Sequence, residues 1–458
     1  MKRRTHGKKG PPRGKKRDKG ARGPEHVSSR PAEGRERMLE RTAREPLWAR
    51  LALDAIARQR ASAEPLDRAL ERVLRAARAG GRERRRAGDA AFAWARARPR
   101  VERAVDDALS RYGGVAPSRR DRDRAAMWLA ELAAGVDEDV GALPEPLDAL
   151  IDEARQSGAG PVLGGAPAPL PRWLEERLAR AFGDEASALA EALGQPAPVV
   201  LAVDQRATSV DDVEAALREL GLDVERSRAA PGALRVSRRF PAARLPERLR
   251  AHVWPMDDGS QAVVHALSVQ PGERVLDLCA GGGGKTRLLL ALGAEVVAMD
   301  PDARRLDAAR ARAPEARFVV ADGTRAPFAT GSFDRVLVDA PCSGTGTLRR
   351  APDLAARLSP EDVARFPPLQ TALLEEAARL VRPGGRVVYA TCSLLPEEND
   401  GVVDQAMASH TDLRARPLED LSGYAGDAPR AFGAWRRALL PSTLGTDGFF
   451  VASLERAR

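Results

Sequence analysis

The sequence predicts an α/β protein whose C-terminal half is a doubly wound, mostly parallel sheet, preceded by an all-helical domain and a small α+β module. Three observations support this prediction. Strand-like apolar runs alternate with amphipathic stretches between residues 256 and 458. Apolar residues recur at helical spacing between residues 46 and 156. Glycine and proline concentrate between residues 157 and 170, which indicates a linker.

Length and charge limit the kinds of protein that this chain can be. Its 458 residues, 43% of them hydrophobic, exceed what one core usually holds, so several domains are expected. The net charge is +9, yet residues 1–50 hold 17 Lys and Arg against 6 Asp and Glu, which leaves 57 against 59 elsewhere. The excess positive charge therefore lies near the N-terminus.

Several classes of protein are not expected. No apolar run reaches the length of a membrane span, and the basic N-terminus lacks the apolar segment of a signal peptide. The three cysteines, Cys279, Cys342 and Cys392, form neither a CxxC pair nor a cluster with histidine, so no disulfide framework and no metal site is expected. We expect a soluble, cytoplasmic monomer that binds no membrane.

The first segment, residues 1–45, is rich in Lys, Arg, Gly and Pro and has few apolar anchors. Such a segment cannot offset the entropy lost on ordering, so we expect a disordered basic tail. Two roles fit it. The tail can tether RNA electrostatically, with binding that weakens as salt rises, or it can be a solubilising leader without a specific role. A nuclear-targeting role fits less well.

The region between the tail and the predicted sheet divides into two parts. Residues 46–156 show helical spacing with few β-branched alternations, which predicts the all-helical domain. After the linker at 157–170, residues 171–255 contain a helix over 173–182 and a strand over 199–203, followed by further short elements. This mixture predicts the small α+β module.

Five apolar runs are expected to form the parallel sheet of a domain at 256–458. They are VLDLCA at 275–280, EVVAMD at 295–300, ARFVVAD at 316–322, RVLVDAP at 335–341 and RVVYATCS at 386–393. Their nearly continuous hydrophobicity is typical of strands buried on both faces. Ligands of such sheets bind beyond the carboxyl ends of the strands.

A glycine-rich loop, Gly281–Gly284 followed by Lys285, comes directly after the first of these strands. It is not a Walker loop, because Cys279 occupies a position where that motif needs glycine. The next strand ends at Asp300, where a carboxylate can accept hydrogen bonds from ribose hydroxyls. Asp322 ends the third strand and can face the adenine side. Each acid alone also fits a turn or cap, and the loop alone fits a structural turn, but the three strand ends together favour an adenosyl ligand.

Two cysteines and an aspartate lie at the ends of the last two predicted strands. The fourth strand ends in a segment with Asp339 and Cys342, and the fifth ends in a segment with Cys392. A thiolate can add to C6 of cytosine, which makes C5 nucleophilic, and it leaves again by elimination. The second thiol can assist that elimination as a base, and Asp339 can hydrogen-bond N3 and the exocyclic amine, or protonate the ring. The alternative is that both cysteines are small core residues, but their Gly/Ser/Thr-rich context favours the reactive role.

Lysine and asparagine are so rare in the predicted folded part of the chain that each one present is a candidate functional residue. Lys285 is the only lysine after Lys19, and Asn399 is the only asparagine in the chain. Asn399 follows shortly after Cys392 and can order the loop that carries it, or cap the next helix.

These motifs resemble those of the Sun-type (Fmu) RNA cytosine-5 methyltransferases, in particular the bacterial 16S ribosomal RNA methyltransferase B type. The resemblance covers residues 171–458. It is carried mainly by MDDGSQAVV at 256–264, VLDLCAGGGGKT at 275–286, DAPCSGTGTLRR at 339–350, YATCSLLPEEN at 389–399 and TDGFFVA at 446–452. DNA cytosine methyltransferases place the nucleophile in the proline-cysteine motif instead, so the TCS segment favours RNA.

The resemblance implies a Rossmann-like methyltransferase domain that uses S-adenosylmethionine to methylate C5 of a cytosine in RNA, with small-subunit ribosomal RNA as the expected partner. It implies that Cys392 is the nucleophile and that Cys342 promotes product release. The implied cofactor contacts are Cys279, Ala280, Gly281, Gly282, Gly283, Gly284, Lys285, Asp300, Asp322 and Asp339. The helical region at 46–156 resembles a NusB-type RNA-binding domain, although a plain packing domain also fits.

The sequence departs from the family pattern at a few positions. Gly281 and Gly282 replace the usual Ala and Pro, which is expected to loosen the cofactor loop. Met256 replaces a usual Gln, and AVD at 202–204 replaces RVN. Two other functions compete with this one: a non-catalytic RNA-binding or ribosome-assembly protein that keeps the fold, and an amino-group methyltransferase, which would normally show a different motif where this chain has DAPC.

Overall fold

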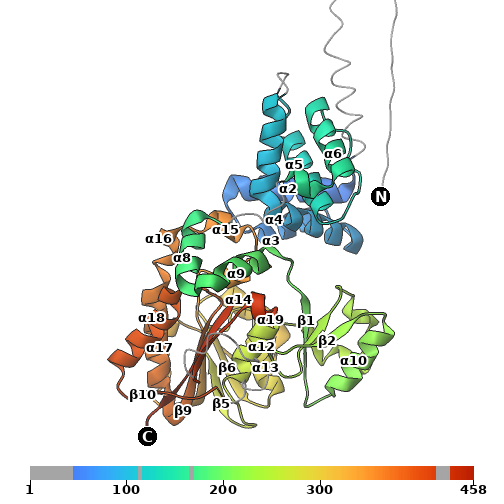
Figure 1. Cartoon of the computed structure of the whole chain (residues 1–458). Helices are drawn as coiled ribbons and strands as arrows, with labels where there is room; N and C mark the ends of the chain where they lie inside the picture. The colour runs from blue at the N-terminus through green and yellow to red at the C-terminus, as the bar shows by residue number, and fades with distance from the viewer. Residues whose placement is uncertain (1–44, 112–115, 164–169, 419–433) are drawn as a thin grey trace, which may run out of the picture. The chain divides into compact units, whose positions relative to one another are not determined.

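The structure, a computed structural model, describes residues 45–111, 116–163, 170–418 and 434–458 (Figure 1). The predicted basic tail, residues 1–45, lies outside the described residues except for Glu45. Among the described helices, none combines the length and the apolarity that crossing a bilayer requires.

Residues 45–111 and 116–163 form the predicted helical domain. Alanine, leucine and arginine, which all favour helices, dominate its sequence. Trp94, Met127 and Ile151 are fully buried in its single core. Its helices are α2 (Leu47–Ser62), α3 (Leu66–Ala76), α4 (Gly81–Arg111), α5 (Arg119–Ala133), α6 (Glu145–Ser157) and α7 (Ala159–Val162).

The core of the helical domain continues into the segment predicted as a linker, residues 157–170. Helix α7 begins at Ala159, and the side chains of Ala159 and Leu163 are buried in that core. The apolar residues in this glycine-rich stretch gain free energy by leaving water, which explains why the first part of it packs. Residues 164–169 lie outside the described residues.

The next part of the chain contains a helical pair and a small antiparallel sheet of order β2-β3-β1-β4. Leu174 and Leu178 pack with Leu394 and Leu440, so the helical pair shares a core with the last domain. The predicted strand at 199–203 is confirmed. The elements are α8 (Arg172–Phe182), η1 (Gly183–Glu185), α9 (Ala186–Gly194), β1 (Val199–Val203), α10 (Val210–Glu219), β2 (Val224–Arg226), β3 (Leu234–Val236), η2 (Ala242–Arg244), α11 (Glu247–Arg250) and β4 (Val253–Pro255).

The predicted parallel sheet is present. Its strands follow the order β10-β12-β9-β8-β5-β6-β7, with β11 beside β12. The five predicted runs pair in parallel as β5 (Arg274–Asp277), β6 (Glu295–Asp300), β7 (Arg317–Val320), β8 (Phe333–Asp339) and β9 (Val381–Thr391). Three antiparallel strands extend the sheet beyond β9, namely β10 (Leu413–Ala415), β11 (Arg436–Leu439) and β12 (Phe449–Arg456).

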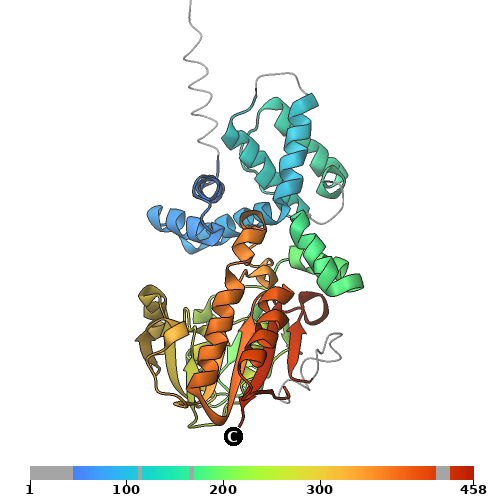
Figure 2. The ribbon, with the colours of Figure 1, turned by 90° about the vertical axis from the view of Figure 1, so that its left-hand side faces the viewer.

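Helices cover both faces of this sheet (Figures 1 and 2). On one face α12 (Asp258–His265) and α13 (Gly284–Ala291) contribute to the core, and on the other α17 (Phe366–Leu380) and α18 (Asp400–Ser409) do so. The strand order reverses at β5, which lies between β6 and β8. In doubly wound sheets this reversal opens the ligand-binding crevice. The remaining elements are α14 (Ala303–Arg312), α15 (Leu354–Arg357), α16 (Pro360–Val363), α19 (Pro441–Leu444), η3 (Gly323–Arg325), η4 (Thr345–Thr347) and η5 (Pro396–Glu398).

Candidate active site

The predicted site residues gather at the carboxyl ends of neighbouring strands. The glycine loop follows β5, Asp300 ends β6, and Asp322 follows β7. On the other side of β5, Asp339 ends β8 and Cys392 follows β9. Since these strands are hydrogen-bonded neighbours, the cofactor half and the reacting half of the predicted site meet at β5 and β8.

The glycine loop is tied to the end of β6. The buried Asp300 accepts the Gly281 N–H at 3.0 Å with one carboxylate oxygen and the Asp302 N–H at 2.8 Å with the other. Gly281 has φ +52° and Gly283 has φ +79°, in the left-handed region that favours glycine. A Cβ on Gly283 would lie 2.7 Å from the Cβ of Ala309, so α14 approaches the loop too closely for a side chain there.

The loop leaves space and acceptors for an adenosyl group. Apart from the adjoining backbone and chain neighbours, no atom lies within 4 Å of where a Cβ on Gly281 or Gly284 would stand. Asp322 is exposed and uses one oxygen to accept the Thr324 N–H and hydroxyl, both at 2.9 Å, which lowers the pKa of its carboxyl. Carboxylates accept up to two hydrogen bonds per oxygen, so Asp300 and Asp322 keep positions for ligand hydroxyls and amines. These residues therefore fit the predicted cofactor.

Cys279 and Ala280, the first residues of the predicted cofactor segment, line the core side of the loop. Ala280 is buried and its N–H donates to the Met299 carbonyl at 2.8 Å. Cys279 packs against the core on the α17 face, and burial raises the pKa of its thiol well above the usual range.

Asp277 is a site residue that the sequence reasoning missed. It is buried at the end of β5, where one oxygen accepts the Thr286 hydroxyl at 2.7 Å and the other has no hydrogen-bond partner within the described ranges. Burial is the main cause that raises the pKa of this carboxyl to about 7. Asp277 was missed because it lies inside the VLDLCA run, which is predicted as a whole to be a strand.

Lys285, predicted in the cofactor loop, reaches the reacting half of the site. Its Nζ donates to Asp339 Oδ2 at 2.6 Å and lies 5.5 Å from the centre of the Phe449 ring. Burial lowers the pKa of Lys285, but the charge of Asp339, the hydrogen bond to it and the nearby Cys392 outweigh burial, and the net shift is upward. The ammonium charge therefore acts on both Asp339 and Cys392.

Cys342 and Cys392 lie in contact. Their sulfur atoms are 3.4 Å apart, and both side chains are half-buried. The hydrogen bond to Cys392, followed by burial, the charge on Cys392 and the charge of Glu398, raises the pKa of the Cys342 thiol well above its usual range. The two thiols that the sequence predicts at one cleft edge are thus brought together.

Asn399 orders the loop that carries Cys392. Its Oδ1 accepts the Thr391 hydroxyl at 2.5 Å, and its Nδ2 donates to the Ser393 carbonyl at 2.9 Å. It also stands at the N-cap position of α18, but its side chain makes no capping hydrogen bond there. Of the two roles considered for Asn399, the contacts match the first.

A buried carboxylate, Glu398, lies beneath the two cysteines and was not singled out from the sequence. It is 0% exposed and accepts hydrogen bonds from the residues that follow the cysteines, Ser343 and Ser393. Its position in the PEEN segment gave no signal of this contact, because the two serines lie in loops 50 residues apart in the chain, after β8 and β9.

Backbone contacts join the cysteine loops to the TDGFFVA segment. Gly346 donates its N–H to the Cys392 carbonyl at 2.9 Å, and Gly448 donates to the Gly346 carbonyl at 2.8 Å. A Cβ on Gly346 would lie 2.1 Å from the Gly448 carbonyl oxygen. This close approach requires glycine and explains why glycine occurs in both motifs.

An ion-pair cluster anchors the same segment. Arg350 donates to Asp447 at 2.5 Å and to Asp257 at 2.9 Å, and Asp257 also accepts the Gly259 and Ser260 N–H groups at the start of α12. Burial and the charge of Asp257 raise the pKa of Asp447 to about 7. Three motifs of the resemblance, MDDGS, TLRR and TDGFF, therefore meet at one cluster.

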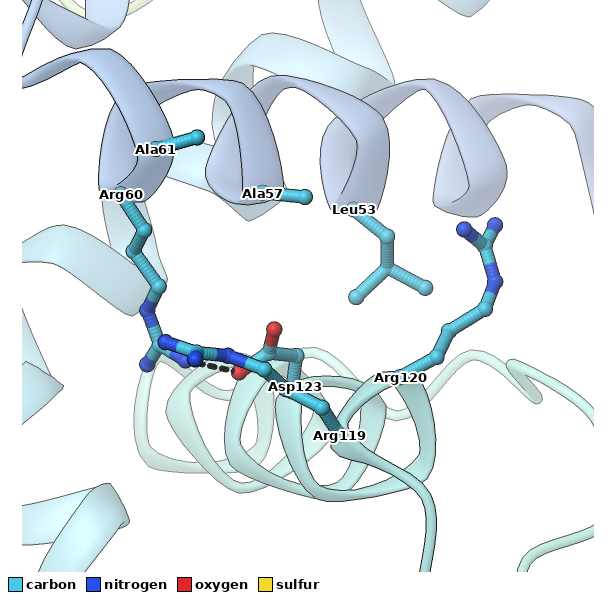
Figure 3. A pocket seen from close by; sticks show the side chains of 7 residues that line it. All are labelled: Leu53, Ala57, Arg60, Ala61, Arg119, Arg120 and Asp123. Carbon is cyan, nitrogen blue, oxygen red and sulfur yellow. Dashed lines mark hydrogen bonds and ion pairs between the residues drawn. The ribbon is translucent and has the colours of Figure 1, made fainter.

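A separate hollow of about 360 Å³ opens in the helical domain (Figure 3). None of the strand-end residues lines it. Arg60 points across it to an ion pair with Asp123 and also pairs with Glu102, so its charge is already balanced. Its lining residues are Leu53, Ala57, Arg60, Ala61, Arg119, Arg120 and Asp123.

Within the described ranges, no group of three or more His, Cys, Asp or Glu side chains is placed to bind a metal.

Two structures from Pyrococcus horikoshii share this fold. One, a methyltransferase homologue, is 28% identical with a TM-score of 0.52, covering 62% of this chain and 95% of that one. The other, NSun6 with SFG, is 19% identical with a TM-score of 0.52, covering 63% of this chain and 98% of that one. The methyltransferase fold predicted from the sequence is confirmed.

Sequence comparisons place the chain in a family. The 16S rRNA methyltransferase RsmB/F family matches residues 264–455, and the RsmF/B-like ferredoxin-like domain matches residues 170–243. The ribosomal RNA small subunit methyltransferase B of Xanthomonas campestris pv. campestris is 34% identical over an alignment of 321 positions, which covers 68% of this chain and 71% of that protein. The chain belongs to the 16S rRNA methyltransferase RsmB/F family.

Proposed function

We propose that this RNA methyltransferase methylates C5 of a cytosine in small-subunit ribosomal RNA, with S-adenosylmethionine as methyl donor and Cys392 as nucleophile. The observation that carries the proposal is the contact of Cys342 and Cys392 at 3.4 Å beside the Lys285–Asp339 pair. This chemistry needs a nucleophilic thiolate, a second thiol that handles the proton of C5, and a carboxylate that hydrogen-bonds the cytosine. Family membership and the ribosomal RNA activity named for the Xanthomonas relative support the substrate class.

We assign the binding of the cofactor to the loop after β5. The Gly281–Gly284 backbone, Asp300 and Asp322 would hold S-adenosylmethionine, which supplies an electrophilic methyl group when bound. The space beside Gly281 and the remaining acceptor positions on the two carboxylates support this assignment. Lys285 directly follows this loop and donates a hydrogen bond to Asp339. One short segment therefore orients both the methyl donor and the carboxylate that holds the cytosine.

The cysteine pair gives each thiol a distinct task. Cys342 contacts the Cys392 sulfur and can donate a hydrogen bond to it, and the Lys285 ammonium nearby stabilises the negative charge that a nucleophilic thiolate carries. The Cys392 sulfur bonds to C6, and the electron pair of the C5–C6 bond moves to C5, which then takes the methyl group. The carboxylate oxygen of Asp339 that Lys285 does not use can accept the exocyclic N–H of the cytosine.

The same contact explains how Cys342 changes role during the reaction. The largest cause of its raised pKa is the hydrogen bond to Cys392. Once the Cys392 sulfur is bonded to C6, it is a neutral thioether, so that cause disappears and the pKa of Cys342 falls. Cys342 can then give its proton to solvent water. Its thiolate removes the proton from C5, the electron pair of the C5–H bond re-forms the C5–C6 double bond, and the Cys392 sulfur leaves C6 as a thiolate.

The test is methyl transfer from labelled S-adenosylmethionine to unmodified small-subunit ribosomal RNA. We expect the wild-type protein to form 5-methylcytosine and Cys392→Ala to form none. Glu397→Gln is the control, because Glu397 is half-exposed and pairs with Arg177, and it should stay active. Persistent RNA binding without transfer by the wild type, or an N-methylated product, would contradict the proposal.

A further inference from the structure

Glu398 is a fully buried acid with no ion-pair partner among the described residues, yet every hydrogen-bonding position of its carboxylate is used. Oε1 accepts the Ser343 N–H at 2.8 Å and the Gln370 side-chain amide at 3.1 Å. Oε2 accepts the hydroxyls of Ser343 and Ser393, both at 2.5 Å. An ionised carboxylate accepts about four hydrogen bonds and donates none, so four donors match its charged form.

The four donors come from segments that carry the two cysteines or support them. Ser343 directly follows Cys342, and Ser393 directly follows Cys392, 50 residues further along the chain. Gln370 of α17 donates to the Pro341 carbonyl at 2.9 Å as well as to Glu398. The residues on both sides of Cys342 are therefore held by one buried network.

The loop of Cys392 is held on both sides in the same way. Thr391 and Ser393 are hydrogen-bonded to Asn399, and Ser393 is also hydrogen-bonded to Glu398. Glu398 and Asn399 are consecutive residues, and the Glu398 carbonyl also accepts the Tyr389 hydroxyl at 2.6 Å. The PEEN segment thus fixes the cysteine loops relative to each other, although it touches neither sulfur.

We propose that Glu398 is a positioning residue that keeps the Cys342 and Cys392 sulfurs in contact, and so keeps Cys392 in its reactive form. The inference deepens the proposed function and rests on it only where methyl transfer is measured. Because the carboxylate is buried beneath the loops, it acts on the reaction through the two serines.

The direction of one measurement separates positioning from electrostatics. Removing the Glu398 charge alone would make both thiols easier to ionise, because a nearby negative charge disfavours a thiolate. Losing the contact between the sulfurs would have the opposite effect on Cys392, because its thiolate would lose the hydrogen bond from Cys342. The pH midpoint of Cys392 alkylation therefore falls if Glu398 acts only by charge and rises if it acts by positioning.

The experiment is alkylation of the full-length protein by iodoacetamide across a pH series, with the modified peptide of Cys392 quantified by mass spectrometry. In Glu398→Gln the new amide group faces hydroxyls that donate in the wild type, so the network loosens without leaving a void. We expect a midpoint higher by about one pH unit, which is about a tenfold slower reaction at neutral pH. The matched control is Glu397→Gln, because Glu397 is half-exposed and pairs with Arg177 instead.

Further variants separate the inference from loss of fold and from failure of the proposed function. Ser393→Ala keeps the Glu398 charge and should also raise the midpoint, while Glu398→Gln combined with Cys342→Ala should add little to Cys342→Ala alone. In methyl transfer we expect kcat to fall about tenfold with the KM for RNA nearly unchanged. An unchanged or lower midpoint in Glu398→Gln overturns the inference, whereas a raised midpoint in a wild-type protein that transfers no methyl overturns only the proposed function.

Discussion

At the scale of single residues, the reactive groups depend on which atoms are buried and which are paired. Cys342, Cys392, Lys285 and Asn399 were predicted from the sequence because they are rare in it and follow strand ends. Asp277 and Glu398 were not predicted, because Asp and Glu are common in this chain and the contacts that distinguish them are long-range. Roles that depend on burial could be assigned only from the structure.

The first prediction concerns Asp277 and pH. Its pKa in the folded protein is about 7, above the ordinary 3.8, so between those values the folded protein holds a proton that the unfolded chain loses. This contribution to stability is present at acid pH and is lost as pH rises through 7, by about 3 kcal/mol between pH 5 and 8. An asparagine side chain stays neutral at every pH, so Asp277→Asn should show a flatter decline in thermal midpoint over this range.

The control for this prediction is Asp322→Asn. Hydrogen bonds from Thr324 lower the pKa of Asp322, so it is ionised in both the folded and the unfolded state above pH 5. Its variant should parallel the wild type across the series. If Asp277→Asn and the wild type decline equally with pH, Asp277 is not protonated in the fold as we describe.

The second prediction concerns Lys285, whose ammonium pairs with Asp339 and interacts with Cys392. Lys285→Met should reduce kcat on the order of a hundredfold, as expected for loss of a charged group that stabilises developing charge. Alkylation of Cys392 at neutral pH should slow as well, which requires no RNA. The control is Arg287→Met, which removes a cation from the same helix. Arg287 donates a hydrogen bond to the Ala251 carbonyl instead, so this variant should retain both activities.

At the scale of secondary-structure elements, the parallel strands were predictable and the antiparallel ones were not. Strands β5 to β9 carry continuous apolar runs, because both of their faces are covered by helices. Strands β10 and β11 are short and lie at one side of the sheet, where arginine replaces much of the apolar pattern. The TDGFFVA motif was recognised as a motif, but its place in β12 beside β9 depends on pairing that no local pattern shows.

The third prediction tests the contact between β12 and the cysteine loops. In Gly346→Ala the new Cβ would stand 2.1 Å from the Gly448 carbonyl oxygen, so backbone must move. We expect a loss of about 1–3 kcal/mol in the free energy of unfolding, typical of overpacking. Activity should fall further than stability explains, because Gly346 also bonds to the Cys392 carbonyl.

A matched control is Gly194→Ala, at the end of α9, where no atom outside its chain neighbours and its own helix backbone lies within 4 Å of the added Cβ. It should change the free energy of unfolding by less than about 0.5 kcal/mol. Both variants are compared by urea unfolding and by methyl transfer. Equal behaviour of the two would show that the approach of Gly346 to Gly448 is not required.

At the scale of the whole molecule, the order of domains followed from composition and spacing, and the chemistry followed from motifs at strand ends. The boundary between the linker and the helical domain was harder to predict, because Ala159 and Leu163 lie in a glycine-rich stretch and yet pack into the helical core. The role of the helical domain in binding RNA stays a prediction.

The fourth prediction concerns the distribution of charge along the chain. Residues 1–50 carry 17 of the 74 Lys and Arg residues, and we expect the predicted tail at 1–45 to tether RNA. A protein lacking residues 1–45 should bind ribosomal RNA more weakly and with a shallower dependence on salt, because fewer phosphates are neutralised. Binding measured between 50 and 200 mM salt checks this, and identical slopes would favour the solubilising role.

The most direct test of the central claim is the identity of the residue that becomes bonded to RNA. Cys342→Ala keeps the nucleophile but removes the group assigned to elimination, so with S-adenosylmethionine and unmodified small-subunit ribosomal RNA it should accumulate a covalent complex. Digestion and mass spectrometry should find a methylated cytidine on the peptide of Cys392. A cytidine bonded to another residue, or full methyl transfer by Cys392→Ala, would contradict the account.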